Sequence, residues 1–239
     1  MSVAFPPALL ADIMEATWPA ASRRALGPFT LRDGAGGGQG VSAATADGAF
    51  TEAHLQDAIA AMAEPLFAIY PDRSPADQAL DAALAARGFH QHDPVVAYAA
   101  PVESLAGELP FLTAFPHWPP LETVRAVWAE GGIGPGRVQV MERAAGQHAA
   151  ILARSGDRPS GAAFVAIHDG VAMLHALEVR PAQRRQGAGA HLLRAAANWA
   201  ADQGARAVSL VVTERNAAAR ALYDRAGMAE VGRYHYRRR

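Results

Sequence analysis

Residues 184–189 read Arg-Arg-Gln-Gly-Ala-Gly, and this stretch decides the fold. It follows an apolar run at 172–179 and opens a helical pattern at 190–202. Where a strand turns into a helix through glycines, the first N–H groups of the helix are free and its dipole favours an anion beside them. Gly187 and Gly189 leave the backbone open, and the two arginines can pair with phosphate oxygens. The stretch therefore predicts a diphosphate site at a helix N-terminus.

The spacing of these residues narrows the choice of ligand class. A dinucleotide-binding loop reads G-x-G-x-x-G with an acidic residue about 20 positions further on, whereas the order here is R-x-x-G-x-G. A P-loop requires a lysine, and this sequence contains none. The R-x-x-G-x-G form resembles the acetyl-CoA pyrophosphate loop of the GNAT N-acetyltransferases.

A second block supports the resemblance. It has the spacing N-x-x-A-x-x-L-Y-x-x-x-G-M, which is similar to the C-terminal helix and following strand of that family, and it consists of Asn216, Ala219, Leu222, Tyr223, Gly227 and Met228. The two blocks stand in the family's order and together cover residues 172–236. The resemblance implies an α/β fold with a mixed sheet flanked by helices, the GNAT or acyl-CoA N-acyltransferase fold. It also implies acetyl-CoA as co-substrate.

Composition sets limits on the class of protein. The chain has 239 residues with 51% hydrophobic and 19% charged residues, enough to form a packed core. The absence of cysteine excludes disulfides, thiolate metal sites and a cysteine nucleophile, and no metal is expected. No apolar run reaches membrane-spanning length, and residues 1–30 lack the pattern of a signal peptide. We therefore expect a cytoplasmic protein without a membrane partner.

Charge is divided unevenly along the chain. Residues 1–110 hold 5 arginines against 13 acidic residues, whereas residues 180–239 hold 12 arginines against 4. A positive field around the loop would concentrate coenzyme A, which carries a diphosphate and a 3′-phosphate. Nucleic acid is the rival partner, but the arginines are dispersed, aromatic residues are few there and no nucleic-acid motif occurs, so we expect none. Residues 237–239 are interpreted as a solvated tail.

The chain divides at a segment that contains five prolines. Residues 1–100 read as a small α/β unit, residues 101–120 as a linker and residues 121–239 as the acetyltransferase domain. A helix–strand–helix pattern that ends at Gly88 echoes the pattern that ends at Gly227. We interpret the first unit as a degenerate GNAT-like copy. It lacks both blocks and is not expected to bind coenzyme A.

The predicted elements follow the order of a GNAT domain. In the first unit, the glycine-rich run 34–40 reads as a connection followed by a strand at 41–45. In the second unit, a helix is expected at 121–130, and strands are expected at 139–143, 149–154, 161–168 and 172–179. The anion loop, a helix, a strand at 207–212, a second helix and a last strand come next.

The resemblance also implies roles for individual residues. Backbone groups of Leu177 and Val179 hold the pantetheine arm, and Asn216 lies near that arm or caps its helix. Tyr223 matches the tyrosine that acts as general acid beside the thioester sulfur, with packing in the core as the alternative. The loop holds the diphosphate, which makes the cofactor-binding set Arg184, Arg185, Gln186, Gly187, Ala188, Gly189 and Ala190.

Two side chains are candidates for the general base. An attacking amine must be neutral, so a base or a water chain takes its proton. Glu178 lies on the strand beside the predicted thioester, and His175 lies three residues earlier, on the opposite face of the strand. Both are candidate catalytic residues, and an ordered water is the alternative.

The expected function is transfer of an acetyl group from acetyl-CoA to a primary amine. The acceptor, a small molecule or a peptide, is not specified by any motif, and neither is the oligomeric state. The alternative from another class is an acyl-CoA-binding or sensory module without turnover. Both interpretations need the loop, but only the enzyme needs Tyr223 at the thioester.

Overall fold

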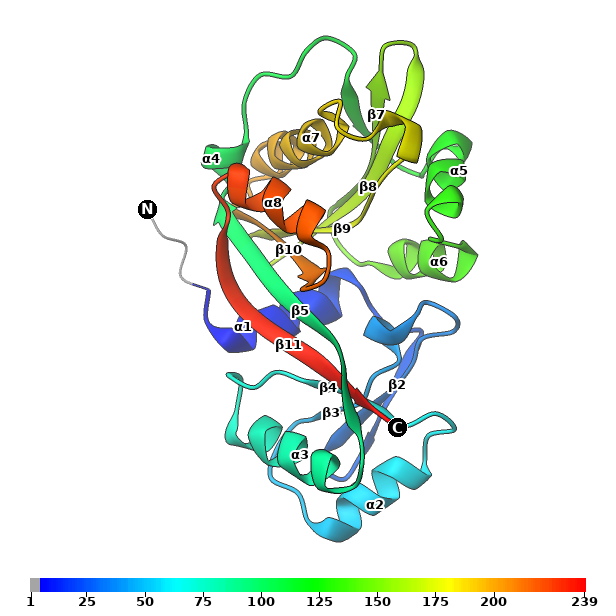
Figure 1. Cartoon of the computed structure of the whole chain (residues 1–239), viewed down its shortest axis with the longest axis vertical. Helices are drawn as coiled ribbons and strands as arrows, with labels where there is room; N and C mark the ends of the chain where they lie inside the picture. Colours follow the sequence, from blue (N-terminus) through cyan, green and yellow to red (C-terminus); the bar gives the residue numbers. More distant parts are fainter. Residues whose placement is uncertain (1–4) are drawn as a thin grey trace.

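The computed structural model describes residues 5–239, which are built on an eight-stranded sheet (Figure 1). The strand order is β4-β11-β5-β10-β9-β8-β7-β6, in which β9 and β10 run parallel and the other neighbours antiparallel. This mixed sheet flanked by helices confirms the predicted class. Its strands are β4 (Leu66–Ile69), β5 (His90–Pro101), β6 (Ala114–His117), β7 (His148–Ser155), β8 (Arg158–His168), β9 (Val171–Val179), β10 (Ala207–Thr213) and β11 (Ala229–Arg238).

A smaller antiparallel sheet precedes these strands. It consists of β1 (Ser22–Leu26), β2 (Phe29–Asp33) and β3 (Thr45–Ala46). A parallel bridge between Ala44 and Phe67 connects its end to β4 of the large sheet. The predicted strand at 41–45 was therefore only partly right: Val41 ends the short helical turn η1 (Gln39–Val41), and strand pairing begins only at Ala44 and Thr45.

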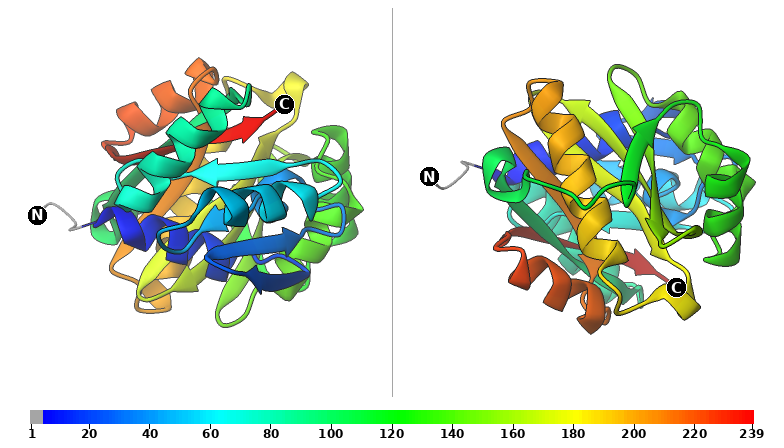
Figure 2. Two further views of the ribbon diagram at one scale, coloured as in Figure 1. Left: turned by 90° about the horizontal axis from the view of Figure 1, so that it is seen from below. Right: turned by 90° about the horizontal axis from the view of Figure 1, so that it is seen from above.

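Eight α-helices cover the two faces of the sheets within residues 5–239 (Figure 2). Helices α7 and α8 pack Leu192 and Tyr223 against Val165 and Leu210 on one face. Helices α5 and α6 cover β7 and β8 on the opposite face, where α1 covers β9 and β11. The helices are α1 (Pro7–Thr17), α2 (Glu52–Ala60), α3 (Pro75–Ala86), α4 (Val102–Leu105), α5 (Glu122–Glu130), α6 (Pro135–Arg143), α7 (Ala188–Asp202) and α8 (Ala217–Arg225).

The two halves of the chain exchange strands at the centre of the sheet. β5, from the first half, lies between β10 and β11 of the second half, and β11 lies between β4 and β5 of the first. Figure 1 shows β5 and β11 side by side along the middle of the molecule. From β1 in the first half and from β7 in the second, the chain follows the same order of three strands, a helix, a strand, a helix and a strand. The halves therefore share one continuous sheet.

The segment 139–143 forms part of helix α6, so the predicted strand there was wrong. Pro135 stands in the first turn of α6, where its missing N–H costs nothing. Val138 and Met141 are both buried, and their spacing of three residues places them on one face of a helix. The alternation of apolar and polar residues around Gln139 imitated a strand.

Two further expectations needed correction. The segment 101–120 is more than a linker, because it contains α4 and the edge strand β6. The C-terminal arginines are not a solvated tail, because β11 continues to Arg238. Arg237 is 15% exposed and its Nε lies 2.7 Å from Oδ1 of Asp81. None of the helices in residues 5–239 combines the length and apolar character needed to cross a membrane.

Candidate active site

A gap between β9 and β10 forms the centre of the candidate site. The two strands pair from Val171 and Ala207 as far as Leu174 and Leu210. Beyond these residues they share no registered pairs, so the carboxyl end of each strand diverges from its neighbour. Backbone groups that leave a ladder are available to other partners. The divergence therefore leaves backbone N–H and C=O groups of β9 without a partner in β10, beside the chain that leads into α7.

The loop 184–189 lies at the end of this gap and leaves the N-terminus of α7 open. Gly187 is the N-cap residue with φ 86°, a left-handed conformation that glycine adopts without strain. No side chain caps α7, whereas Asn216 caps α8 through its Oδ1, 3.1 Å from the Ala219 amide. The first amides of α7 are thus unsatisfied by side chains, as an anion site requires. A side chain on Gly189 would lie 3.1 Å from Leu222 of α8.

The arginines of the loop differ in their contacts. Arg184 donates from Nε to the carbonyl of Val179 at 3.0 Å and from Nη2 to Oε1 of Glu178 at 3.2 Å. Arg185 is exposed and has φ 63°. Gln186 accepts a hydrogen bond from Ser155 at 3.0 Å. The loop therefore has one arginine already bound to β9 and a second that is exposed.

A bulge in β9 changes which way its side chains face. The registered pairs step from Ala162–Glu178 to Phe164–His175, so β9 has one residue more than β8 in this interval. Ala176 has φ 51° within the bulge. The extra residue places His175 and Glu178 on the same face, toward α1 and α5. The prediction that they lie on opposite faces was therefore wrong.

His175 is buried and hydrogen-bonded. Its Nε2 lies 2.8 Å from the Thr17 hydroxyl, which donates its hydrogen to the Ile13 carbonyl at 2.7 Å. The Thr17 hydroxyl has a single hydrogen, so Nε2 must donate and Nδ1 carries the lone pair. The ring stacks on Trp18 with centroids 4.9 Å apart. Burial lowers the pKa of His175 to about 3, so this imidazole is a weak base near neutral pH.

The buried His175 should make the fold sensitive to acid. Its pKa in the folded state is depressed from 6.5, so its stabilisation is present above pH 6.5 and is lost as the pH falls toward about 3. We expect the free energy of unfolding of the wild type to fall, relative to His175→Gln, by at most about 1.4 kcal/mol per pH unit in this window. Denaturant unfolding from pH 7 to pH 4 measures the difference. His90→Gln, at an exposed position, is the control, and parallel profiles for wild type and His175→Gln would contradict this expectation.

Glu178 is partly exposed on the same face. Its side chain is 20% accessible and pairs with Arg184 at 3.2 Å. Gly131, in the turn between α5 and α6, lies directly over it, and a side chain at Gly131 would collide with the Glu178 side chain. The carboxylate therefore lies at the edge of the gap, under the turn between α5 and α6.

Tyr223 lies on the opposite side of the sheet from His175 and Glu178. It belongs to α8, is 6% exposed and packs against Tyr98 with ring centroids 5.6 Å apart. Among residues 5–239 its hydroxyl has no hydrogen-bond partner. Burial raises the pKa of Tyr223 to about 12, so the phenol keeps its proton throughout the neutral range. Leu177 and Val179 pack on this same side, in the cluster that contains Tyr223.

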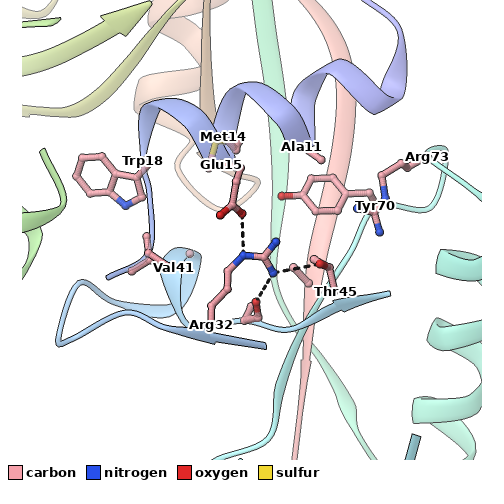
Figure 3. Close-up of a pocket in the computed structure, with 13 residues that line it drawn as sticks. Ala11, Met14, Glu15, Trp18, Arg32, Val41, Thr45, Tyr70 and Arg73 are labelled. Carbon is pink, nitrogen blue, oxygen red and sulfur yellow. Dashed lines mark hydrogen bonds and ion pairs between the residues drawn. The ribbon is translucent and has the colours of Figure 1, made fainter. Parts of the chain in front are cut away.

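A separate pocket lies in the first half of the chain (Figure 3). Arg32 occupies it, with Nε 2.7 Å from Glu15 and Nη1 3.1 Å from the Thr45 hydroxyl. The remaining volume is about 30 Å³, room for about one water molecule. This pocket therefore lacks space for an extended ligand. In the described part of the chain, no three histidine or acidic side chains gather as a metal site would require.

Two diverging parallel strands followed by a glycine loop and an open helix N-terminus define the acyl-CoA N-acyltransferase class of fold. Residues 117–228 match the acetyltransferase (GNAT) family. An uncharacterised N-acetyltransferase of Bacillus subtilis (strain 168), YobR, is 34% identical over 73 residues, which are 30% of this chain and 30% of that protein. The match covers just under half of the chain, and it identifies residues 117–228 as a GNAT acetyltransferase domain.

Solved structures share the fold over most of the chain. A GCN5-related N-acetyltransferase from Kribbella flavida has a TM-score of 0.71 and 20% identity, over 97% of this chain and 95% of that one. A tandem GNAT protein from the clavulanic acid biosynthesis pathway has a TM-score of 0.57 and 16% identity, over 87% and 76% of the two chains. At these identities the likeness concerns the fold.

Proposed function

We propose that this protein transfers an acetyl group from acetyl-CoA to a primary amine by direct attack of the amine on the thioester. The single observation that carries the proposal is the uncapped N-terminus of α7 beside the gap between β9 and β10. The open amides would bind the diphosphate, and the gap would take the pantetheine arm alongside Leu177 and Val179. The family match over residues 117–228 supports this chemistry.

The reaction requires two proton movements. The amine nitrogen forms a bond to the thioester carbon, the carbon–sulfur bond breaks and the thiolate leaves. Tyr223 would donate its phenolic proton to the sulfur, because its raised pKa keeps the phenol protonated. Glu178, directly or through water, would take the proton from the amine. It is better suited than His175, which is buried and weakly basic.

Arg184 would link cofactor binding to this site. Its guanidinium is bound to the Glu178 carboxylate and the Val179 carbonyl. A diphosphate is a stronger partner for a guanidinium than a carbonyl is, because charge-assisted bonds to phosphate are the stronger kind. When Arg184 turns to the diphosphate, it would release Glu178 for the amine and the Val179 backbone for the pantetheine arm.

Tyr223→Phe tests the proposed general acid. We expect kcat to fall about 100-fold, because loss of a positioned acid typically costs 10²–10⁴-fold, while acetyl-CoA affinity stays within about twofold. Thiol release measured with a panel of primary amines gives kcat, and calorimetry gives affinity. Tyr98→Phe, on the other side of the ring contact, is the matched control.

The same measurements separate the enzyme from its alternative. Binding of acetyl-CoA by the wild type without thiol release from any amine would favour an acyl-CoA-binding module. A Tyr223→Phe enzyme as fast as the wild type would remove Tyr223 from the mechanism but leave the transfer reaction in place.

We further propose that residues 1–100 are a degenerate copy that does not bind coenzyme A. Helix α2 occupies the place in the first half that α7 has in the second, but Thr51 and His54 cap its amides reciprocally at 3.3 Å. At the end of β3, Arg73 donates to the Ala46 carbonyl at 2.7 Å. The groups that would meet a diphosphate and a pantetheine arm are therefore already occupied by side chains.

A further inference from the structure

The peptide group between Ala176 and Leu177 is the part of the β9 bulge that matters for the chemistry. Neither residue has a registered partner in β8 or β10. A trans peptide is planar, so its C=O and N–H point in opposite directions. The direction of the Ala176 carbonyl therefore sets the direction of the Leu177 amide.

Trp128 holds that carbonyl. Its indole Nε1 donates to the Ala176 oxygen at 2.9 Å from the α5 side of the sheet. The side chain is fully buried among Val124, Met141 and Phe164, so the donor has a fixed position. The carbonyl thus points toward α5, and the Leu177 N–H points to the opposite side, where Tyr223 and the N-terminus of α7 lie.

We propose that Trp128 is a positioning residue: through the Ala176 carbonyl it aims the Leu177 amide at the thioester carbonyl oxygen. The inference rests on the proposed acetyl transfer. As the amine attacks, negative charge develops on that oxygen, and a pre-aligned N–H stabilises it without reorganisation. Without the indole donor, the peptide at a non-glycine residue with φ 51° has lost the contact that holds its orientation.

Trp128→Phe keeps an aromatic ring and removes the donor. We expect kcat to fall about 10- to 100-fold. This effect should not exceed that of removing a whole oxyanion donor, because the Leu177 amide remains present but is less well aligned. The Kd of coenzyme A should stay within about twofold. Trp199→Phe is the matched control, because Trp199 is partly buried on α7 and its indole has no partner among the described residues.

A second measurement separates positioning from packing. S-ethyl-CoA, a thioether, lacks the carbonyl oxygen that the Leu177 amide would contact. The wild type and Trp199→Phe should therefore bind acetyl-CoA more tightly than S-ethyl-CoA, and Trp128→Phe should lose that preference. If Trp128→Phe fails to fold, Trp128→benzothienylalanine, in which sulfur replaces the indole N–H at nearly constant shape, takes its place.

The outcomes are distinct. Equal kcat and equal discrimination between the two ligands in the Trp128 variant and in Trp199→Phe would overturn the inference. Loss of kcat and of discrimination in the Trp128 variant alone supports it. A wild type that binds acetyl-CoA but releases no thiol with any amine contradicts the proposed transfer itself, and the ligand preference still reports on the amide.

Discussion

A chain cut in the exposed loop after Glu108 should yield a C-terminal fragment, residues 109–239, that does not fold alone. The fragment lacks β5, which pairs with β10 along the whole of that strand and with β11 on its other side. Without β5, both neighbours expose open edges, and the core loses the buried side chains of Val96 and Tyr98. Circular dichroism and size exclusion should show no cooperative melting and association into aggregates.

The same cut supplies its own control. When residues 1–108 and 109–239 are produced together, we expect them to assemble into a two-chain complex with a cooperative thermal transition, because all strand pairs are restored. A monomeric fragment 109–239 with a sharp transition and acetyl-CoA affinity like that of the intact chain would show that the exchanged strand is dispensable.

The exchange of β5 and β11 could not be inferred from the sequence. Helix α5 and strands β7, β8 and β9 were predicted nearly at their observed positions, because glycine stops, turn residues and apolar spacing are local signals. The position of a strand within a sheet depends on partners more than a hundred residues away. Nothing local in the run at 90–101 indicates that it separates β10 from β11.

The candidate site also has features that the local sequence predicts and features that it does not. The residues proposed to bind the diphosphate are contiguous, so their spacing alone suggests the site, and no side chain caps the helix that follows them. The bulge is invisible in the sequence, because residues 171–179 are apolar almost throughout and show no period-2 pattern for an extra residue to interrupt. The bond from Trp128 to Ala176 spans 48 positions and likewise has no local signal.

The loop itself gives the second large expected effect. In Gly187→Val, a β-branched side chain must adopt φ near 86°, which valine disfavours, and its Cβ would lie 3.5 Å from His191. The loop must then change conformation, and the amides of Ala188 and Gly189 no longer converge on one anion. We expect acetyl-CoA affinity to fall at least about 100-fold, which corresponds to about 2.8 kcal/mol of binding free energy.

Gly204→Val is the matched control for this change. Gly204 follows the other end of α7 with φ 80° and has open space around it, so the substitution adds the same kind of backbone strain far from the loop. Both variants should lose about 1–2 kcal/mol of stability, because each forces a side chain into the left-handed region. Calorimetric titration with acetyl-CoA then separates strain from recognition. Equal affinities in the two variants would mean that the diphosphate does not bind at the N-terminus of α7, and the cofactor site would have to lie elsewhere.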